Sequence, residues 1–97
     1  IYNFEWDDEK SVSSRRKHGV GFEEAATVFR DPNAITIHDP EHCDDEERWV
    51  TMGISENGRL LVACHTFQEK IDNVVLIRIF SSRKANKKEI VIYGERS

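Results

Sequence analysis

The sequence has few of the residues that indicate a secreted, membrane-spanning or disordered protein. Its 97 residues include two cysteines and two prolines, and no apolar run approaches the roughly 18 residues that a spanning helix needs. Two cysteines supply no disulfide framework, so we expect a reduced, cytoplasmic protein without contact to a membrane. The first residues have neither the basic nor the apolar region of a secretory signal, and we expect no such signal.

Length and composition predict one small folded domain, residues 1–97. Hydrophobic residues make up 38% of the chain and charged residues 33%, which allows a folded core but is too polar for a membrane protein. A domain of this size buries a limited core, so a tightly bound partner would stabilise it.

The net charge of −4 conceals an uneven distribution along the chain. Residues 1–50 contain six Lys and Arg against thirteen Asp and Glu, whereas residues 51–97 contain eight against five. A basic C-terminal half within an acidic chain is typical of a protein that binds a polyanion locally and stays soluble. The alternative is an ordinary solvated surface without a ligand.

Three segments carry helix signals, namely residues 7–18, 22–29 and 83–93. The first has an aspartate that can cap its start and a glycine after its end, but Val12 is its only aliphatic residue. The second has apolar residues at i, i+3, i+4 and i+7, which predicts one buried face. The third follows a pair of serines, either of which can cap it.

Four further segments have the alternation of strands, namely residues 34–37, 48–54, 59–67 and 74–81. The Asn57-Gly58 pair between the second and third predicts a tight hairpin turn. Short connections favour antiparallel pairing, and helices segregated from strands favour the α+β class. We therefore predict two N-terminal helices, a four-stranded antiparallel sheet and a C-terminal helix.

Five basic residues gather where the last strand is expected to meet the last helix. Arginine suits phosphate because its planar fork binds two oxygens and stays charged, and a helix N-terminus would add N–H donors. The alternative is that Arg78 pairs with a carboxylate of the acidic residues 39–47 while the lysines only solvate a helix. The five residues are Arg78, Arg83, Lys84, Lys87 and Lys88.

Two groups of histidines suggest other chemistry. His65 falls on the strand expected beside that of Arg78, and a neutral imidazole there could accept a proton near pH 7. A hydrogen-bonded surface histidine is the alternative. His38, His42 and Cys43 could in principle bind zinc, but a tetrahedral site usually needs a second ligand pair, so we predict no metal and no other cofactor.

Several separated blocks of the sequence, in order, resemble the BrnT family. The last block departs from the family's usual ending, Arg-Ile-Ile-Ser-Ala-Arg, because Phe80 stands for the middle Ile and Ser82 for the Ala. The resemblance covers nearly the whole chain. The blocks read FEWD, KHGV, FEEA, ER, GRLLV, HT and RIFSSRKA, and begin at Phe4, Lys17, Phe22, Glu47, Gly58, His65 and Arg78.

This resemblance implies a toxin of a bacterial type II toxin–antitoxin pair with a RelE-like fold. It implies cleavage of RNA that stops translation, and neutralisation by a BrnA-like antitoxin, a DNA-binding protein of ribbon-helix-helix type. The toxin would then meet DNA only through its antitoxin. A different interpretation is a non-catalytic module that binds RNA or a partner and acts in operon repression.

The expected chemistry uses the neighbouring 2′-OH of RNA as nucleophile, without a metal. It needs groups that move protons and cations that stabilise the charge on phosphorus. We expect Arg78 and Arg83 to clamp phosphate, Lys84 to assist, and His65 to act as acid or base. RNA-binding candidates are Lys10, Arg59, Lys87 and Lys88, and further candidates from the family blocks are Glu47 and Arg48.

Overall fold

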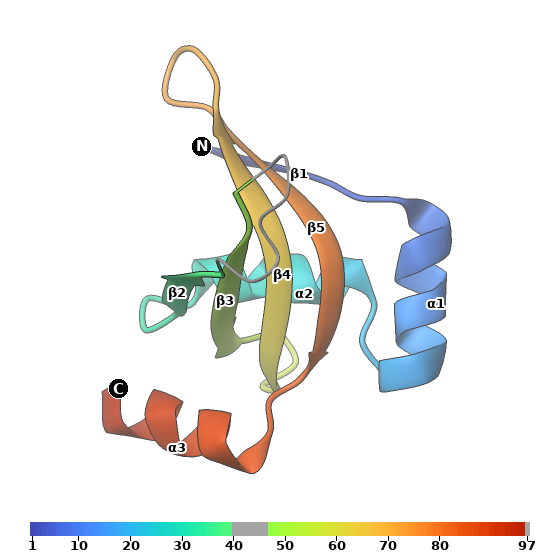
Figure 1. The fold of residues 1–97 in the computed structure, drawn as a ribbon, viewed down its shortest axis with the longest axis vertical. Helices are drawn as coiled ribbons and strands as arrows, with labels where there is room; N and C mark the ends of the chain where they lie inside the picture. The colour runs from blue at the N-terminus through green and yellow to red at the C-terminus, as the bar shows by residue number, and fades with distance from the viewer. Residues whose placement is uncertain (40–46, 97) are drawn as a thin grey trace.

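The computed structural model describes residues 1–39 and 47–96, which form a five-stranded mixed sheet with three α-helices (Figure 1). The strand order is β1-β5-β4-β3-β2. The class is α+β, as predicted. The strands are β1 (Tyr2–Glu5), β2 (Ile35–His38), β3 (Trp49–Ile54), β4 (Leu60–Glu69) and β5 (Val75–Lys84), and the α-helices are α1 (Asp8–His18), α2 (Phe22–Ala26) and α3 (Lys87–Arg96).

The prediction of four antiparallel strands is wrong by one strand. β2 to β5 pair antiparallel as expected, but β1 adds to the edge of β5 in parallel, with Phe4 beside Ile77 and Glu5 beside Arg78. A four-residue strand that pairs with a segment more than 70 residues away leaves almost no local signal, because parallel pairing needs no hairpin turn. This missed strand brings the N-terminus next to the basic strand.

The first helix docks through serines instead of aliphatic side chains. Its buried residues are Ser11 and Ser14, whereas Val12 is 53% exposed. The Ser14 hydroxyl donates to the Val20 carbonyl at 2.6 Å, and the Ser11 hydroxyl accepts from the Phe22 N–H at 2.9 Å. These bonds tie α1 to the start of α2, which explains how a helix with so little apolar surface is held.

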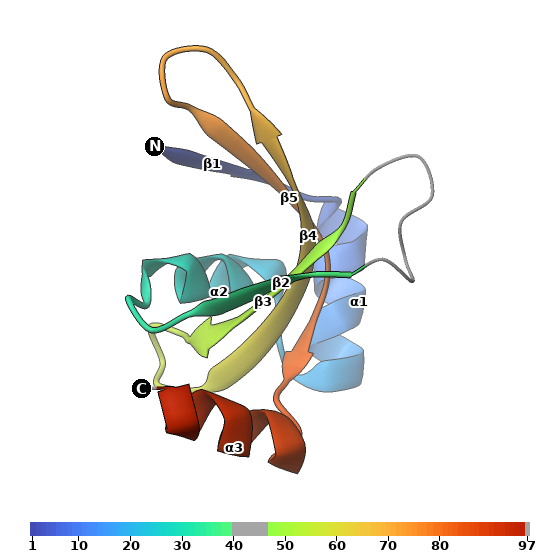
Figure 2. The same ribbon diagram turned by 60° about the vertical axis from the view of Figure 1, so that its left-hand side comes forward.

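The second helix is shorter than expected, and it covers one face of the sheet. α2 ends at Ala26 and continues as a 3₁₀ turn, Thr27–Arg30. Its Phe22 and Ala25 pack with Leu61 and Ala63 of β4 and Ile77 of β5 into the core cluster. Figure 1 shows α2 behind the sheet, and both Figure 1 and Figure 2 show α3 at the lower end of the sheet.

The opposite face of β1, β5 and β4 carries polar and charged side chains, and we call it the open face. Successive side chains of a strand point to opposite faces, so the open face holds the residues that alternate along each strand with the core residues. Residues that pair directly share a face, so Thr66 lies with Arg78, and Val62 with Arg83. The open face as defined here comprises Glu5, Val62, Cys64, Thr66, Gln68, Leu76, Arg78, Ser81 and Arg83.

A bulge in β5 interrupts this alternation. Ile79 pairs with His65 and Ser81 with Cys64, so Phe80 is an extra residue in the ladder. Beyond the bulge, the strand continues to Lys84, three residues further than predicted. The predicted serine cap is wrong as well, because Asn86 caps α3: the Asn86 side chain accepts from the Glu89 N–H, and Glu89 accepts from the Asn86 N–H, both at 2.8 Å.

No helix within residues 1–39 and 47–96 is long and apolar enough to cross a membrane.

Candidate nucleic-acid interface

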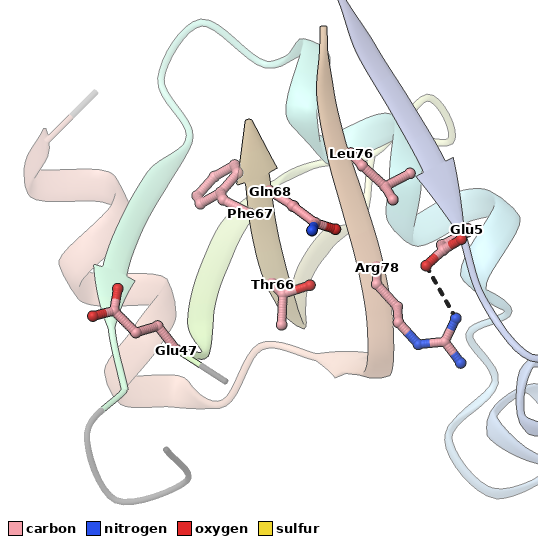
Figure 3. Close-up of a pocket in the computed structure, with 7 residues that line it drawn as sticks. All are labelled: Glu5, Glu47, Thr66, Phe67, Gln68, Leu76 and Arg78. Atoms are coloured by element: carbon pink, nitrogen blue, oxygen red, sulfur yellow. Dashed lines mark hydrogen bonds and ion pairs between the residues drawn. The ribbon is translucent and has the colours of Figure 1, made fainter. Parts of the chain in front are cut away.

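A cavity of about 520 Å³ opens on the polar side of β4 and β5. Figure 3 shows Arg78 and Glu5 on one side of Thr66 and Glu47 on the other. The cavity therefore combines a cation, two carboxylates, a hydroxyl and an amide on one surface. Its lining residues are Glu5, Glu47, Thr66, Phe67, Gln68, Leu76 and Arg78.

Arg78 reaches this cavity because it alternates with the buried Ile77 and Ile79 along β5. Its Nη1 atom lies 3.2 Å from Oε1 of Glu5, the residue beside it on β1. The side chains are 41% and 46% exposed, so water screens the pair and it contributes little to stability. Glu5 thus orients the guanidinium while leaving it accessible to an anion. The sequence left open that Arg78 pairs with a carboxylate of residues 39–47, whereas the partner in this ion pair is Glu5 of β1.

A second cavity of about 300 Å³ lies beside the first, around the bulge of β5. The Arg48 guanidinium carbon is 4.4 Å from the centre of the Phe80 ring, and that of Arg78 is 5.9 Å from it. Two guanidinium groups thus meet at one aromatic ring. The cavity is lined by Lys10, Asp39, Arg48, Cys64, Phe80 and Ser81.

Arg83 lies on the open face but is held by the last helix. Its guanidinium binds both carboxylate oxygens of Glu89, at 2.7 and 2.9 Å, and this pairing raises the pKa of Arg83. The expected N–H donors of a helix start are absent at Arg83 in the described structure, because residue 83 still belongs to β5. Arg83 therefore fixes the start of α3 and presents its 45% exposed side chain near the open face.

Lys84, which was expected to assist Arg78 and Arg83 in holding phosphate, lies on the other side of the sheet from both. Lys84 pairs with the buried Leu61 of β4. Its Nζ atom lies next to Gly19, 3.8 Å from the point that a Cβ atom on this glycine would occupy. Gly19 ends α1 in the left-handed region, with φ at 73°. The lysine thus sits near the negative end of the α1 dipole, which it stabilises.

Arg59, which was expected to bind RNA, is engaged in structure, and its side chain is 34% exposed. Its guanidinium donates two bonds to the Glu24 carboxylate and one to the Gly19 carbonyl at 2.9 Å. The bond from Arg59 lowers the pKa of Glu24 to about 2. The pair connects the start of β4 to α2, at the end of the sheet opposite the cavities.

His65 lies in the core, with no exposed surface. Its Nδ1 atom is 3.3 Å from the Thr66 carbonyl, which can only accept, so this nitrogen carries the proton. Its Nε2 atom accepts from the Thr51 hydroxyl at 2.6 Å. Burial lowers the pKa of His65 to about 4, and the side chain contacts Phe29 and Phe67. This position contradicts the expected acid or base role, because an enclosed imidazole cannot reach a substrate on the open face.

The remaining candidates divide between the open face and other surfaces. Lys10 and Arg48 line the second cavity, and Glu47 lines the first. Lys87 and Lys88 belong to α3 and are exposed. Of the three residues considered for zinc, His42 and Cys43 lie outside the described residues, so the absence of a metal site stays a prediction.

The sequence did not predict the roles of two residues of this surface. Glu5 belongs to the first block that resembles the family, and the alternation of residues 2–5 was the only other sign that it lies in a strand. Phe80 departs from the isoleucine of the resembled family ending. Its half-buried ring lies on the same side as Arg78, and the bulge that places Ser81 on that side as well has no local signal.

A sequence model of the family described as "Ribonuclease toxin, BrnT, of type II toxin-antitoxin system" matches residues 6–89. This match spans most of the 97 residues and includes β4 and β5 of the open face, whereas β1 with Glu5 precedes it. A search of curated proteins finds no match to the chain.

Proposed function

Because the chain belongs to the BrnT family of ribonuclease toxins of type II toxin–antitoxin systems, we propose that its open face binds and cleaves RNA. We propose further that it does so without a metal, in the cytoplasm, with inhibition of translation as the result, and that the fold is RelE-like. The observation that carries the assignment of the site is the accessible Arg78, oriented by Glu5 at the edge of a polar cavity.

The reaction begins with proton removal from the ribose 2′-OH. The 2′ oxygen attacks phosphorus, the bond to the 5′ oxygen breaks, and the products are a 2′,3′-cyclic phosphate and a 5′-hydroxyl. A proton must reach the departing 5′ oxygen, and water can supply it in an open cavity. Negative charge builds up on the phosphoryl oxygens, so a fixed cation there lowers the barrier.

Arg78 has the position for this cation, since its guanidinium is oriented by one carboxylate and open to solvent. Glu5 is bound to Arg78 and acts as the positioning residue. Glu47 lines the same cavity and is the proton acceptor in this proposal, in place of His65. Its carboxylate faces away from Arg78 in Figure 3, so the proposal requires a rotation of this exposed side chain toward the RNA. Arg83 provides a second cation toward the RNA backbone, although Glu89 holds it in the free protein.

Single-stranded RNA also needs a cationic track beyond the reacting phosphate. Lys10 and Arg48 line the adjoining cavity, so the track continues from Arg78 across Phe80 toward α1. Lys87 and Lys88 extend positive charge along the start of α3. Lys87 and Lys88 are proposed to bind backbone phosphates, and Lys10 and Arg48 to contact the RNA within the adjoining cavity. Arg59 and Lys84 are left out because they stabilise the opposite side.

The antitoxin in this proposal is BrnA-like, of ribbon-helix-helix type, and links the toxin to DNA. An aliphatic cavity of about 470 Å³ between α3 and β2 supports a protein partner near the open face. Ile37 is 59% exposed there, and Ile90, Val91 and Ile92 of α3 are also exposed. An amphipathic antitoxin segment with acidic residues would cover this apolar surface and neutralise the neighbouring Arg83.

The test is cleavage of a single-stranded RNA by the purified protein in the presence of a chelator, with mapping of both ends of the products. Glu47→Gln is expected to lower the cleavage rate by about 10² or more, with little change in RNA affinity. Titration with the antitoxin should stop cleavage. RNA binding without any cleavage would overturn the ribonuclease assignment and support the non-catalytic alternative.

A further inference from the structure

Phe80 is the residue that the bulge adds to β5. Phe80 and Ser81 together oppose Cys64, and all three line the second cavity. A bulge turns a side chain away from the regular alternation of its strand, and bulges are frequent beside active sites. Here the added residue is aromatic, and it lies between the cavity that contains Arg78 and the α1 helix that contains Lys10.

Basic side chains surround this ring, and the carboxylate of Asp39 lines the same cavity. Arg48 approaches the ring centre to 4.4 Å and Arg78 to 5.9 Å. A further cavity of about 190 Å³ along α1 is lined by Phe80 together with Lys10, Lys17 and His18. An aromatic ring within a basic track is the arrangement with which proteins bind single-stranded nucleic acid, because bases stack on the ring while cations contact phosphates.

Phe80 and Arg48 together form a stacking surface of two planar groups. Aromatic rings and guanidinium planes both accept stacked bases. The cavity of about 300 Å³ beside them falls at the lower end of the sizes found for small-molecule sites. The Ser81 hydroxyl and the Lys10 ammonium in its lining can hydrogen-bond the edge of a base.

We infer that Phe80, together with Arg48, is a nucleobase subsite that holds one unpaired base of the RNA next to the phosphate at Arg78. The inference rests on the proposed function and adds a determinant of base preference to it. Purines present a larger π surface than pyrimidines, so this subsite prefers a purine. An aliphatic side chain at this position would offer no such surface.

The test uses single-stranded oligonucleotides with 2′-O-methyl groups, which can be bound but cannot be cleaved. Affinities are measured by fluorescence anisotropy for an all-purine and an all-pyrimidine strand of equal length, over a range of salt concentrations. The variants are Phe80→Ile, which removes the π surface, and Phe80→Trp, which retains one. Thermal melting of each variant confirms that it is folded.

Phe80→Ile is expected to weaken binding of the purine strand roughly tenfold and to abolish the purine preference, with an unchanged salt slope. Phe80→Trp should retain both affinity and preference. Arg78→Ala is the matched control, since loss of a phosphate contact reduces the slope of log affinity against log salt by about 0.7.

The outcomes separate this inference from the proposed function. If the parent binds both strands equally, or if Phe80→Ile binds like the parent, the base subsite is wrong while the RNA-binding face stands. A folded Phe80→Ile variant whose salt slope falls like that of Arg78→Ala would also overturn stacking as the cause. If the parent binds neither strand, the proposed function fails together with the subsite.

Discussion

The two faces of the sheet use the same residue types for different purposes. On the helix-covered side, Arg59 makes three hydrogen bonds to Glu24 and Gly19, and His65 is enclosed with both ring nitrogens bonded. On the open face, Arg78 binds Glu5 with both side chains more than 40% exposed. The first set can stabilise the fold, whereas the second is available to an outside polyanion.

Position on a strand, and not residue type, therefore decides whether a charged side chain is engaged within the fold or open to solvent. Lys84 and Arg83 are adjacent in the chain, yet they lie on opposite sides of the sheet. Variants of matched chemistry on the two faces should therefore separate loss of activity from loss of stability.

The largest separation is expected between Arg78→Ala and Arg59→Ala. Arg78→Ala should lower the RNA cleavage rate by about 10² to 10³, because it removes a cation from the transition state, and should leave the melting temperature nearly unchanged. Arg59→Ala should lower the melting temperature and leave the rate of the folded protein intact. Cleavage assays below each melting transition check this, and normal cleavage by Arg78→Ala would remove that residue from the site.

The enclosed histidine predicts a loss of stability in mild acid. The pKa of His65 is about 4 in the folded protein against 6.5 when unfolded, so the unfolded chain binds its proton first. The stability is complete above pH 6.5 and falls by about 3 kcal/mol as the pH drops to 4. Urea unfolding at several pH values measures this. The decline over this range should flatten in His65→Gln, and an equally steep decline there would assign it to other groups.

A second decline at lower pH is expected from the carboxylate that binds Arg59. The pKa of Glu24 is about 2 when folded against 4.5 unfolded, so its contribution is complete above pH 4.5 and is lost as the pH falls toward 2. Glu24→Gln should cost on the order of 2 kcal/mol at pH 7 and reduce this second decline. Glu5→Gln on the open face is the matched control, with an expected effect below about 0.5 kcal/mol.

The smallest effect concerns the anchor of α3. The Tyr93 hydroxyl donates to Asp31, and this bond raises the pKa of Tyr93 to about 12. Tyr93→Phe should lower stability by about 1 kcal/mol at pH 7. In the parent, this contribution is complete below pH 10 and is lost as the pH rises toward 12. An unchanged unfolding midpoint in Tyr93→Phe would show that the bond contributes nothing to the anchoring of α3.

Much of the secondary structure follows from local pattern. The cap and the glycine around α1, the periodicity of α2 and the alternation of β2 to β5 predicted those elements within a few residues. The family resemblance is confirmed by the match over residues 6–89. Arg78 was correctly expected on a sheet surface, since its neighbours Ile77 and Ile79 are apolar and strands alternate.

The composition of the site required the tertiary structure. β1 pairs with a distant strand, so the partnership of Glu5 with Arg78 has no local signal. Arg83 and Lys84 were predicted at the start of a helix, but β5 extends to Lys84. As neighbouring strand residues, the two side chains therefore point to opposite sides of the sheet.

Local pattern was enough to predict the α+β class, most of the helices and strands, and the basic C-terminal half, because periodicity and charge are properties of neighbouring residues. The packing of the strands was needed to find that His65 is enclosed by Phe29 and Phe67, and that a bulge adds Phe80 to β5. Both outcomes depend on the register between strands. A shift of one residue in that register exchanges buried and exposed side chains, and no local pattern specifies where such a shift occurs.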